Sequence, residues 1–436
     1  MEYRRRGAAL IVLISLLIIL FSSAAAAPHR QSRPGKEQKK TDTAVSLIAS
    51  QPEAVLPQIA GEEDGEIPVF SIGIRTMEGA SVTCVWTVDG EEAGNGTVFS
   101  LDSCDDPSIG VHTVQCRVTC RLPDGTVLTE DSVPVSWIRC TGIIPNSVLT
   151  FSDVHGDYSH IGLAIGEIME KNGGKIPALI ICSGDWTGGS SATEQEDAEK
   201  IIPALRAQCG GIDTVFTAGN HDNRQAAVSA NADAAPDTGD GAAFPGVADG
   251  LGTSDGTDGL AVFSIHFEDV IVRNQRGRKS CSYAGILEKL EAFLETQAAK
   301  TEKSLIIISS HTGLHALGIQ PESSAKAWAG GSIYNVDQSD QVISLLNRYA
   351  EEYGLRILFL FGHNHSKGEK EFCLNTGDTI FSTSEYADRI RNIQELKFTY
   401  AHAGYLTDGS GGTKHYTFLT WDDETFSRVS EQIGSP

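Results

Sequence analysis

The stretch SVLTFSDVHGDYSH, residues 147–160, joins an apolar run to a dense group of polar side chains. Residues 147–151 read as a buried strand, because a short continuous apolar run is typical of a strand that is covered on both faces. Asp153, His155 and Asp157 follow within a few positions. Such a group forms either a turn or a metal site, and the rest of the chain decides between the two.

Four further apolar runs, ALIIC, TVFTA, SLIIISS and RILFLF, end in the same way, with polar residues of the kinds that bind metals. Those residues are Asp185 in CSGDWTGG, Asn220, His221 and Asp222 in TAGNHDNR, His311 in ISSHTGLH, and His363 and His365 in FLFGHNHS. The carboxyl ends of strands in an α/β sheet carry the loops that build sites. We therefore expect these side chains to lie in one neighbourhood.

The apolar runs alternate with stretches of helical pattern, which predicts an α/β domain whose sheets are covered by helices. The expected helices are residues 159–171, 192–207, 284–299 and 336–353. Residues 231–259 are rich in Ala, Gly and Asp and have no periodicity, so they are expected to form a low-complexity loop insertion. That loop either lies over the mouth of the site or is simply solvated.

The order of the motifs, D-x-H, G-D, G-N-H-D, a lone His and G-H-x-H, resembles that of the calcineurin-like metallophosphoesterase superfamily over residues 146–425. One such motif alone is more often a turn or a helix cap than a ligand, whereas all five in order are specific. The resemblance implies a four-layer sandwich, with two mixed β-sheets flanked by helices and two metal ions at the strand ends. It assigns Asp153, His155 and His365 to the first metal, Asn220, His311 and His363 to the second, and Asp185 to both as a bridge. Asp157 lies outside the matched ligands and is expected to support the loop.

The same resemblance implies dinuclear-metal-dependent hydrolysis of phosphoesters by a metal-bridging hydroxide, in an exported phosphatase or phosphodiesterase. Imidazole and carboxylate ligands suit Mn, Fe or Zn, and two such ions can clamp phosphate oxygens and acidify a water. His221 is expected to protonate the leaving oxygen, with Asp222 orienting its ring. Gly184, Gly219 and Gly362 are expected to leave room for the ligands.

Differences between this sequence and two groups of the superfamily narrow the expected kind of phosphoesterase. Purple acid phosphatases place an iron-binding tyrosine three residues after the bridging aspartate, where this chain has Gly188, so an Fe–Tyr site is not expected. Exported 5′-nucleotidases carry a further substrate domain, which is not expected here either. Arg224 is expected to form a surface ion pair rather than a contact with substrate phosphate. His160, His266, His315 and His402 have no motif context and are expected to be structural, with His315, four residues after His311, the first candidate among them for supporting the ligands. Cys182 is expected in the core.

The first 27 residues read as a signal peptide, with a basic start, an apolar stretch at residues 8–21 and an A-x-A pattern. The alternative is an uncleaved membrane anchor, for which the apolar stretch is short. Residues 28–42 are polar and basic and read as a disordered linker. The protein is therefore expected to be secreted or exposed at the cell surface.

Residues 43–142 show short runs of period two separated by turn signals, which predicts an all-β sandwich of immunoglobulin-like type. Nine cysteines are present, and five of them lie between residues 80 and 140. In an exported chain this density suggests disulfides. Cys84 with Cys116 is the pair that the immunoglobulin-like pattern suggests.

The net charge of −23 is unevenly distributed, since residues 1–40 hold eight of the 34 basic residues and only two of the 57 acidic ones. The rest of the chain is strongly acidic and repels polyanions, which excludes an extended nucleic-acid partner. A small phosphoester remains as the expected substrate. Membrane contact is expected only through an uncleaved N-terminal segment. A second hypothesis is a cell-surface binding or adhesion protein in which the hydrolase domain is accessory. The oligomeric state does not follow from the sequence.

Overall fold

The fold is taken from a computed structural model of the 436-residue chain. The structure describes residues 48–49, 52, 55–60, 67–103, 108–188, 194–234, 247–248, 260–273, 279–281, 283–301, 305–314, 336–363, 373–374, 395–407, 414–422 and 426–433. The predicted signal peptide and linker lie outside these ranges.

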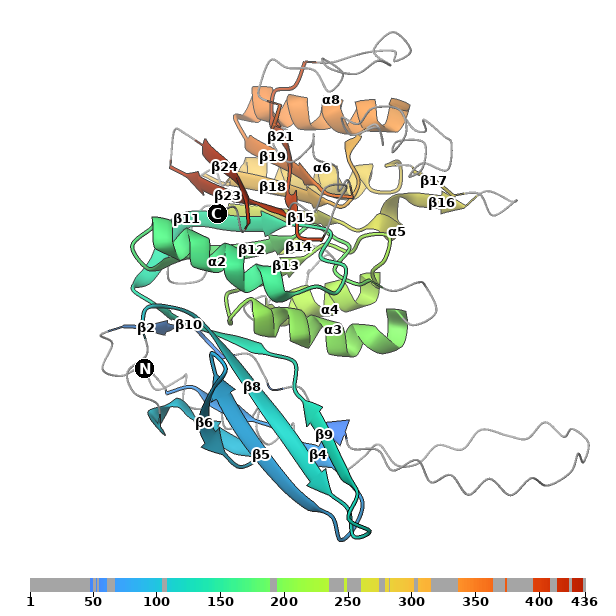
Figure 1. The fold of residues 1–436 in the computed structure, drawn as a ribbon. Coiled ribbons are helices and arrows are strands. Elements are labelled where there is room, and N and C mark those ends of the chain that lie inside the picture. The colour runs from blue at the N-terminus through green and yellow to red at the C-terminus, as the bar shows by residue number, and fades with distance from the viewer. Residues whose placement is uncertain are drawn as a thin grey trace, which may run out of the picture. The chain divides into compact units, whose positions relative to one another are not determined.

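Two mixed β-sheets form the centre of the α/β part (Figure 1). In the first sheet the strands run in the order β13-β12-β11-β23-β22, with β24 beside β23. Its strands are β11 (Gly142–Phe151), β12 (Lys175–Cys182), β13 (Thr214–Phe216), β22 (Gly404–Tyr405), β23 (His415–Trp421) and β24 (Phe426–Gln432). Strands β11, β12 and β13 are parallel, and β23 is antiparallel to β11.

The second sheet has the order β14-β15-β18-β19-β21-β20. Its strands are β14 (Val247–Ala248), β15 (Leu260–Ile265), β18 (Leu305–Ser310), β19 (Arg356–Phe361), β20 (Cys373–Leu374) and β21 (Thr399–His402). Strands β15, β18, β19 and β21 are parallel, so their carboxyl ends lie at the same edge.

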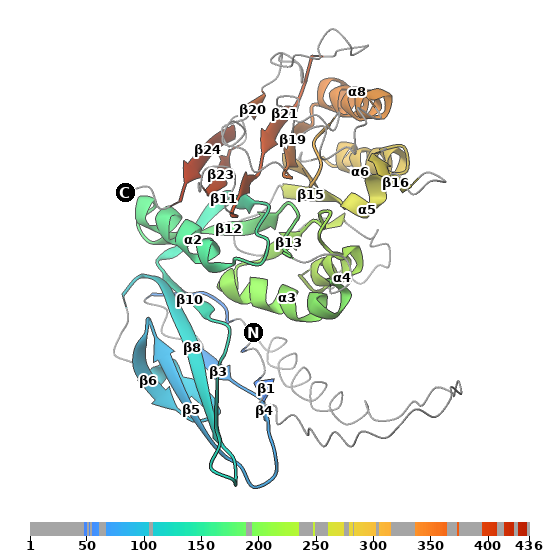
Figure 2. The ribbon, with the colours of Figure 1, turned by 45° about the vertical axis from the view of Figure 1, so that its right-hand side comes forward.

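Helices cover the outer face of each sheet, as Figures 1 and 2 show. The helices are α2 (Ser159–Lys171), α3 (Glu194–Gln208), α4 (Arg224–Ala234), α5 (Phe267–Val270), α6 (Leu287–Ala299) and α8 (Val336–Tyr353). Helices α2, α3 and α4 share a core with the first sheet, and α6 and α8 share one with the second. A third core lies between the sheets. The layers therefore run helix, sheet, sheet, helix, as the sequence predicts.

The side chains of β19 show why its apolar run is continuous. Leu358 and Leu360 belong to the core between the sheets, whereas Ile357, Phe359 and Phe361 face helices α6 and α8. Alternate residues of a strand point to opposite faces, so a strand buried on both faces needs apolar residues at every position.

Helices α2 and α8 have the predicted bounds, but the predicted loop insertion at 231–259 is only partly right. Residues 231–234 form the last turn of α4, and residues 247–248 form β14, which pairs with β15. The hairpin β16–β17 (Ile271–Arg273 and Lys279–Cys281) follows α5 directly. The α/β part extends from β11 to the end of β24, a few residues beyond the predicted range at each end.

The described residues of the N-terminal region form strands and one short 3-10 helix, η1 (Leu101–Ser103). Its strands are β1 (Ile48–Ala49), β2 (Gln58–Ile59), β3 (Val69–Ser71), β4 (Ile74–Arg75), β5 (Ser81–Val88), β6 (Glu91–Asn95), β7 (Val98–Ser100), β8 (Gly110–Arg121), β9 (Val127–Asp131) and β10 (Val135–Cys140). The main sheet has the order β2-β10-β8-β5-β6, with β9 beside β8. The pair β3–β7 packs on this sheet, because Phe70 and Phe99 contact the buried Trp86. The immunoglobulin-like assignment remains a prediction.

The structure contradicts the predicted disulfide between Cys84 and Cys116. The two residues lie on adjacent strands of one sheet, where Trp86 is opposite Cys116 and Cys84 is opposite Val118. Both are buried and both thiols are free. The disulfide of an immunoglobulin-like domain joins strands of two facing sheets, whereas here the two strands pair directly in one sheet.

The N-terminal strands share core with the α/β part. Ile138 and Cys140 of β10 belong to the same cluster as α2 and α3, and Gln208 of α3 donates a hydrogen bond to the carbonyl oxygen of Pro134. Among the described residues, the structure contains no helix that is long and apolar enough to span a bilayer.

Candidate metal centre

Six of the seven predicted metal ligands are described, and all six follow the ends of strands in the two sheets. Asp153 and His155 follow β11, Asp185 follows β12, Asn220 follows β13, His311 follows β18, and His363 follows β19. His365 lies outside the described residues. The facing sheets thus bring residues more than 200 positions apart to one edge of the sandwich.

Four of these residues have a backbone conformation that L-residues seldom adopt. Asp153, His155, Asp185 and His363 have φ values of 52°, 49°, 52° and 73°. Non-glycine residues with positive φ are uncommon, and they concentrate where a site requires a particular side-chain direction. Hydrogen bonds hold this backbone in place, since the amides of Asp153 and His155 donate to the carbonyl oxygens of Gly184 and Asp185, at 2.8 and 2.9 Å.

Asp185 is the residue that the two halves of the centre share. It is 2 % exposed and belongs to two groups of potential metal ligands, one with His155 and His221 and the other with His311 and His363. Within each group the ligand atoms all lie within 4.8 Å of one another. Its Oδ2 lies 3.8 Å from His155 Nε2 and 3.1 Å from His311 Nε2, so this carboxylate lies between the two groups and is suited to bridging two ions.

The more buried half of the centre is built around His311, which has no exposed surface. Its Nε2 lies 3.1 Å from Asp185 Oδ2, 3.2 Å from Asn220 Oδ1 and 3.2 Å from His363 Nδ1. Its Nδ1 lies 3.0 Å from the carbonyl oxygen of Ser183. Because a carbonyl oxygen only accepts, Nδ1 carries a proton and Nε2 is the atom that faces the other ligands.

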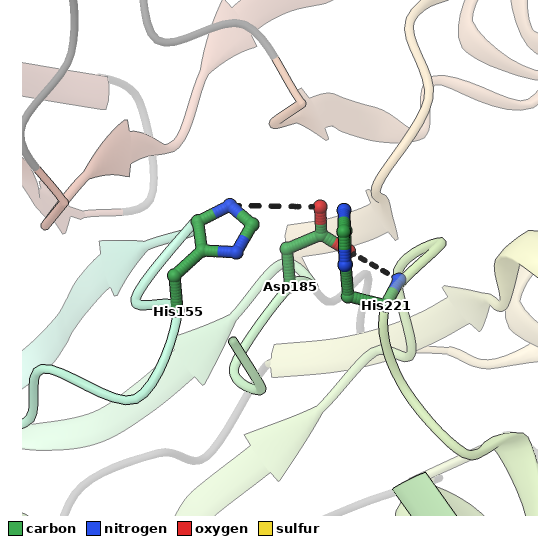
Figure 3. A group of neighbouring side chains, drawn as sticks. All are labelled: His155, Asp185 and His221. Carbon is green, nitrogen blue, oxygen red and sulfur yellow. Dashed lines mark hydrogen bonds and ion pairs between the residues drawn. The ribbon is translucent and has the colours of Figure 1, made fainter. Parts of the chain in front are cut away.

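The other half contains His155, whose Nε2 lies 3.8 Å from Asp185 Oδ2 and 3.9 Å from Asp153 Oδ1. Its Nδ1 donates to the carbonyl oxygen of Thr187 at 3.2 Å. Figure 3 shows His155 and His221 on either side of Asp185, with the backbone amide of His221 donating to Asp185 Oδ1 at 2.9 Å. The two imidazole rings are 5.0 Å apart and nearly perpendicular.

The charges of this cluster favour a cation at its centre. Burial lowers the pKa of His311, but the negative charges of Asp185 and Asp153 outweigh this effect and raise that pKa to about 9. Burial likewise raises the pKa of Asp185, and His311 more than reverses the effect, so that the pKa falls below its usual range. The buried carboxylates of Asp153 and Asp185 therefore require a positive charge beside them, which a bound cation would supply.

Asp222 holds the loop that carries Asp185. Its Oδ1 accepts from the amide of Thr187 at 3.0 Å, and its Oδ2 accepts from the amides of Gly219 and Trp186 at 2.8 and 3.3 Å. Burial and the charge of Asp185 raise the pKa of Asp222, against the effect of these amides. The predicted contact was with the ring of His221, but the carboxylate of Asp222 ties the G-D and G-N-H-D loops together.

Three glycines beside the ligands occupy positions where a side chain would collide with the centre. A Cβ atom would lie 2.5 Å from His311 Nδ1 at Gly184, 2.2 Å from Asp185 Oδ1 at Gly219, and 2.5 Å from Ser152 Oγ at Gly362. Contacts under 3.0 Å are essentially never seen for a real Cβ. The predicted need for small residues is therefore explained by the packing of the ligands and of Ser152.

Other sequence predictions have definite outcomes. A Cβ atom at Gly188 would lie 2.5 Å from the carbonyl oxygen of His155, so that position has no room for a tyrosine. Arg224 forms the predicted ion pair, with Asp269 Oδ1 at 3.0 Å. Asp157, in the loop before α2, accepts a hydrogen bond from the hydroxyl of Ser159, the first residue of that helix. Cys182 is buried in the core, as predicted. His315 lies outside the described residues.

The sequence reading missed several residues that support the ligands. Ser152 Oγ lies 2.5 Å from Asp153 Oδ2 and 2.6 Å from the carbonyl oxygen of Gly404. The buried His266 accepts a hydrogen bond at Nδ1 from the amide of Ala218, at 3.0 Å, just before the G-N-H-D motif. Serine after an apolar run, or a lone histidine, carries no signal of its own, and only the position next to a motif could have indicated these roles.

The residues present fit a pair of divalent ions. Each half offers imidazole nitrogen together with carboxylate or amide oxygen, a donor set that suits borderline divalent metals. Backbone carbonyls fix the orientation of His155 and His311, and the glycines leave the space that the ligands fill.

A match to one protein-family model agrees with this geometry. The family model described as calcineurin-like phosphoesterase matches residues 147–367. No curated protein sequence matches the chain. Solved structures that are similar include a purple acid phosphatase from yellow lupin (Lupinus luteus) seeds, with 10 % identity, a TM-score of 0.35, and coverage of 88 % of this chain and 72 % of that one. The NAD nucleotidase of Haemophilus influenzae is 12 % identical, with a TM-score of 0.30 and coverage of 66 % and 49 %, so this chain spans about half its length. Both TM-scores are too low to bear on function.

Proposed function

Because the chain belongs to the calcineurin-like phosphoesterase family, we propose that it is a hydrolase of small phosphoesters that uses two metal ions. The observation that carries the proposal is the pair of ligand groups joined through the one carboxylate of Asp185. When bound, two divalent ions supply Lewis acidity toward phosphate oxygens and lower the pKa of a water. Monoesters and diesters are both candidate substrates.

Each half of the centre has its own set of ligands for one ion. His155 and Asp153, together with the predicted His365, hold one ion, and His311, His363 and Asn220 hold the other. Asp185 contributes to both. The buried carboxylates and the carbonyl-anchored imidazoles keep these donor atoms fixed before substrate arrives, so little reorganisation is required during the reaction.

His221 is the proposed general acid for the leaving oxygen. Its backbone amide is bonded to Asp185, which places the ring beside His155 at the less buried half of the centre. A positioned imidazole contributes about 10²–10⁴-fold through proton transfer. Asp222 supports this role indirectly, by holding the main chain on both sides of the Asp185 loop.

We further propose that the protein acts outside the cytoplasm. The support is the basic start, apolar stretch and small residues at positions 1–27. In this setting the N-terminal strands form an immunoglobulin-like domain that precedes the hydrolase. The alternative hypothesis of a binding protein with an accessory hydrolase domain is decided by the same measurement as the main one.

The test is hydrolysis of p-nitrophenyl phosphate and bis-p-nitrophenyl phosphate by the metal-stripped full chain, with Mn, Fe, Zn or Mg added back. Metal-restored cleavage is the expected result, and the preferred ester identifies a monoesterase or a diesterase. Absence of cleavage with every metal, in protein that has bound the ions, would contradict the proposal and favour the binding-protein hypothesis.

A further inference from the structure

We propose that Thr187 is a positioning residue that sets His155 and His221 against Asp185, and that its hydroxyl group governs metal affinity on this side of the centre. The inference rests on the proposed function, since it concerns the same two-metal site. Thr187 lies two residues after Asp185, is 2 % exposed, and is not among the residues that the sequence motifs assign as ligands.

All three polar groups of Thr187 bond to the centre. Its carbonyl oxygen accepts from His155 Nδ1 at 3.2 Å, which leaves Nε2 as the atom facing Asp185 and Asp153. Its amide donates to Asp222 Oδ1 at 3.0 Å. Its hydroxyl donates to the carbonyl oxygen of His221 at 2.5 Å.

The hydroxyl of Thr187 adds a second hydrogen bond between His221 and the Asp185 loop. The amide of His221 donates to Asp185 Oδ1, and the carbonyl of His221 accepts from Thr187, so both sides of this residue are tied to the Asp185 loop. Without the hydroxyl, the carbonyl oxygen of His221 loses this donor, while the amide of His221 keeps its bond to Asp185. Asp222 still joins the two loops through the amides of Trp186 and Thr187, but the loop that carries the Thr187 carbonyl is then held by fewer bonds, and so is the His155 ring that this carbonyl orients.

The other half of the centre has the same arrangement, which argues that it is functional. Ser183, two residues before Asp185, accepts from His311 Nδ1 through its carbonyl oxygen, and its hydroxyl lies 3.0 Å from that of Ser309 at the end of β18. The residues at equal distances before and after Asp185 therefore each orient one histidine of one half. Groups that orient ligands in this way typically change metal affinity by about 10–100-fold when they are removed.

The test compares Thr187→Val, Thr187→Ala and Thr187→Ser in the full chain. Thr187→Val keeps the shape and loses the hydroxyl, and Ser and Ala differ from each other only by the hydroxyl. The matched control is Thr214→Val, because Thr214 is also buried and its hydroxyl donates to a backbone carbonyl, that of Ile212 at 2.9 Å. The readout is the affinity for each of two Mn²⁺ ions, measured by competition with a fluorescent chelator.

We expect Thr187→Val and Thr187→Ala to weaken one of the two ions by about 10-fold or more, and Thr187→Ser and Thr214→Val to bind as the wild type does. Wild-type affinity in the Val and Ala variants would overturn the inference, and so would a Ser variant no better than Ala. If Val does not fold, the Ser and Ala pair gives the answer alone. A wild-type chain that binds no Mn²⁺ would instead count against the proposed function.

Discussion

Gly219 offers the most direct perturbation of the shared ligand, because one added methyl group there collides with Asp185. In Gly219→Ala the Cβ would lie 2.2 Å from Asp185 Oδ1 and 2.5 Å from the Asp185 backbone nitrogen. Ordinary van der Waals contact begins at 3.4 Å, so the carboxylate oxygen must move by about 1 Å. The φ of Gly219 is not in the left-handed region, so the cost is this collision and not backbone strain.

A displacement of about 1 Å at a reacting centre can cost roughly 10²-fold in rate, which corresponds to about 2.7 kcal/mol of transition-state stabilisation. We therefore expect kcat/KM of Gly219→Ala toward an aryl phosphate to fall by about 100-fold or more. Metal content should fall as well, because the displaced carboxylate belongs to both ligand groups. Both quantities are measured on the purified full chain, by steady-state kinetics and elemental analysis.

The control is Gly166→Ala in α2, where a Cβ would meet nothing within 4 Å. This change should leave activity and metal content unchanged and stabilise the helix by about 0.5–1 kcal/mol. Two bound ions and near-normal kcat/KM in Gly219→Ala would refute the reasoning, because they would show that the carboxylate position beside Gly219 does not matter.

Three further changes test separate parts of the centre. Asp185→Asn keeps the size and removes the charge, and should lose at least one ion as well as activity; elemental analysis that finds two ions per chain would contradict the bridging role. His221→Ala should lower kcat by about 10²–10⁴-fold with metal content intact, because the amide that holds Asp185 remains; turnover near that of the wild type would remove His221 from the mechanism. Burial lowers the pKa of His266 from 6.5 to about 4, so the folded state resists protonation and its stability is lost as pH falls from 6.5 toward 4. This shift amounts to about 3 kcal/mol of unfolding free energy. In His266→Asn, which keeps an acceptor for the amide of Ala218, the unfolding free energy measured with denaturant should depend less on pH over that range. The same pH dependence in the variant and the wild type would contradict this role of His266.

The parts of the fold that could be predicted are those with strong periodicity or continuous burial. Helices α2 and α8 begin and end where the pattern indicates, and the strands before the five motifs occur as expected. Residues 231–234 extend α4, but their composition of Ala, Asn and Asp resembles a loop and gives no apolar stripe. The helix there continues from the preceding turns, whose buried Ala227 and Ala230 pack in the core of the first sheet.

The ligands themselves could be predicted because metal-binding residue types recur at strand ends in a fixed order. The groups that hold the ligands could not, because they are backbone carbonyls and small hydroxyl residues. Thr187 and Ser183 orient histidines through main-chain oxygens that every residue possesses. The sequence identified Asp222 as a residue of the site. Its partners, however, are backbone amides that only the fold brings close to it, and no local pattern indicates them.

The central claim is that one carboxylate joins two metal ions, and electron paramagnetic resonance of the Mn²⁺-loaded full chain tests it most directly. At two equivalents of Mn²⁺ we expect a spin-coupled spectrum, because ions that share a ligand lie about 4 Å apart. The Asp185→Asn variant should give only the six-line signal of an isolated ion. Two bound ions without coupling in the wild-type chain, or a single binding site, would contradict the account.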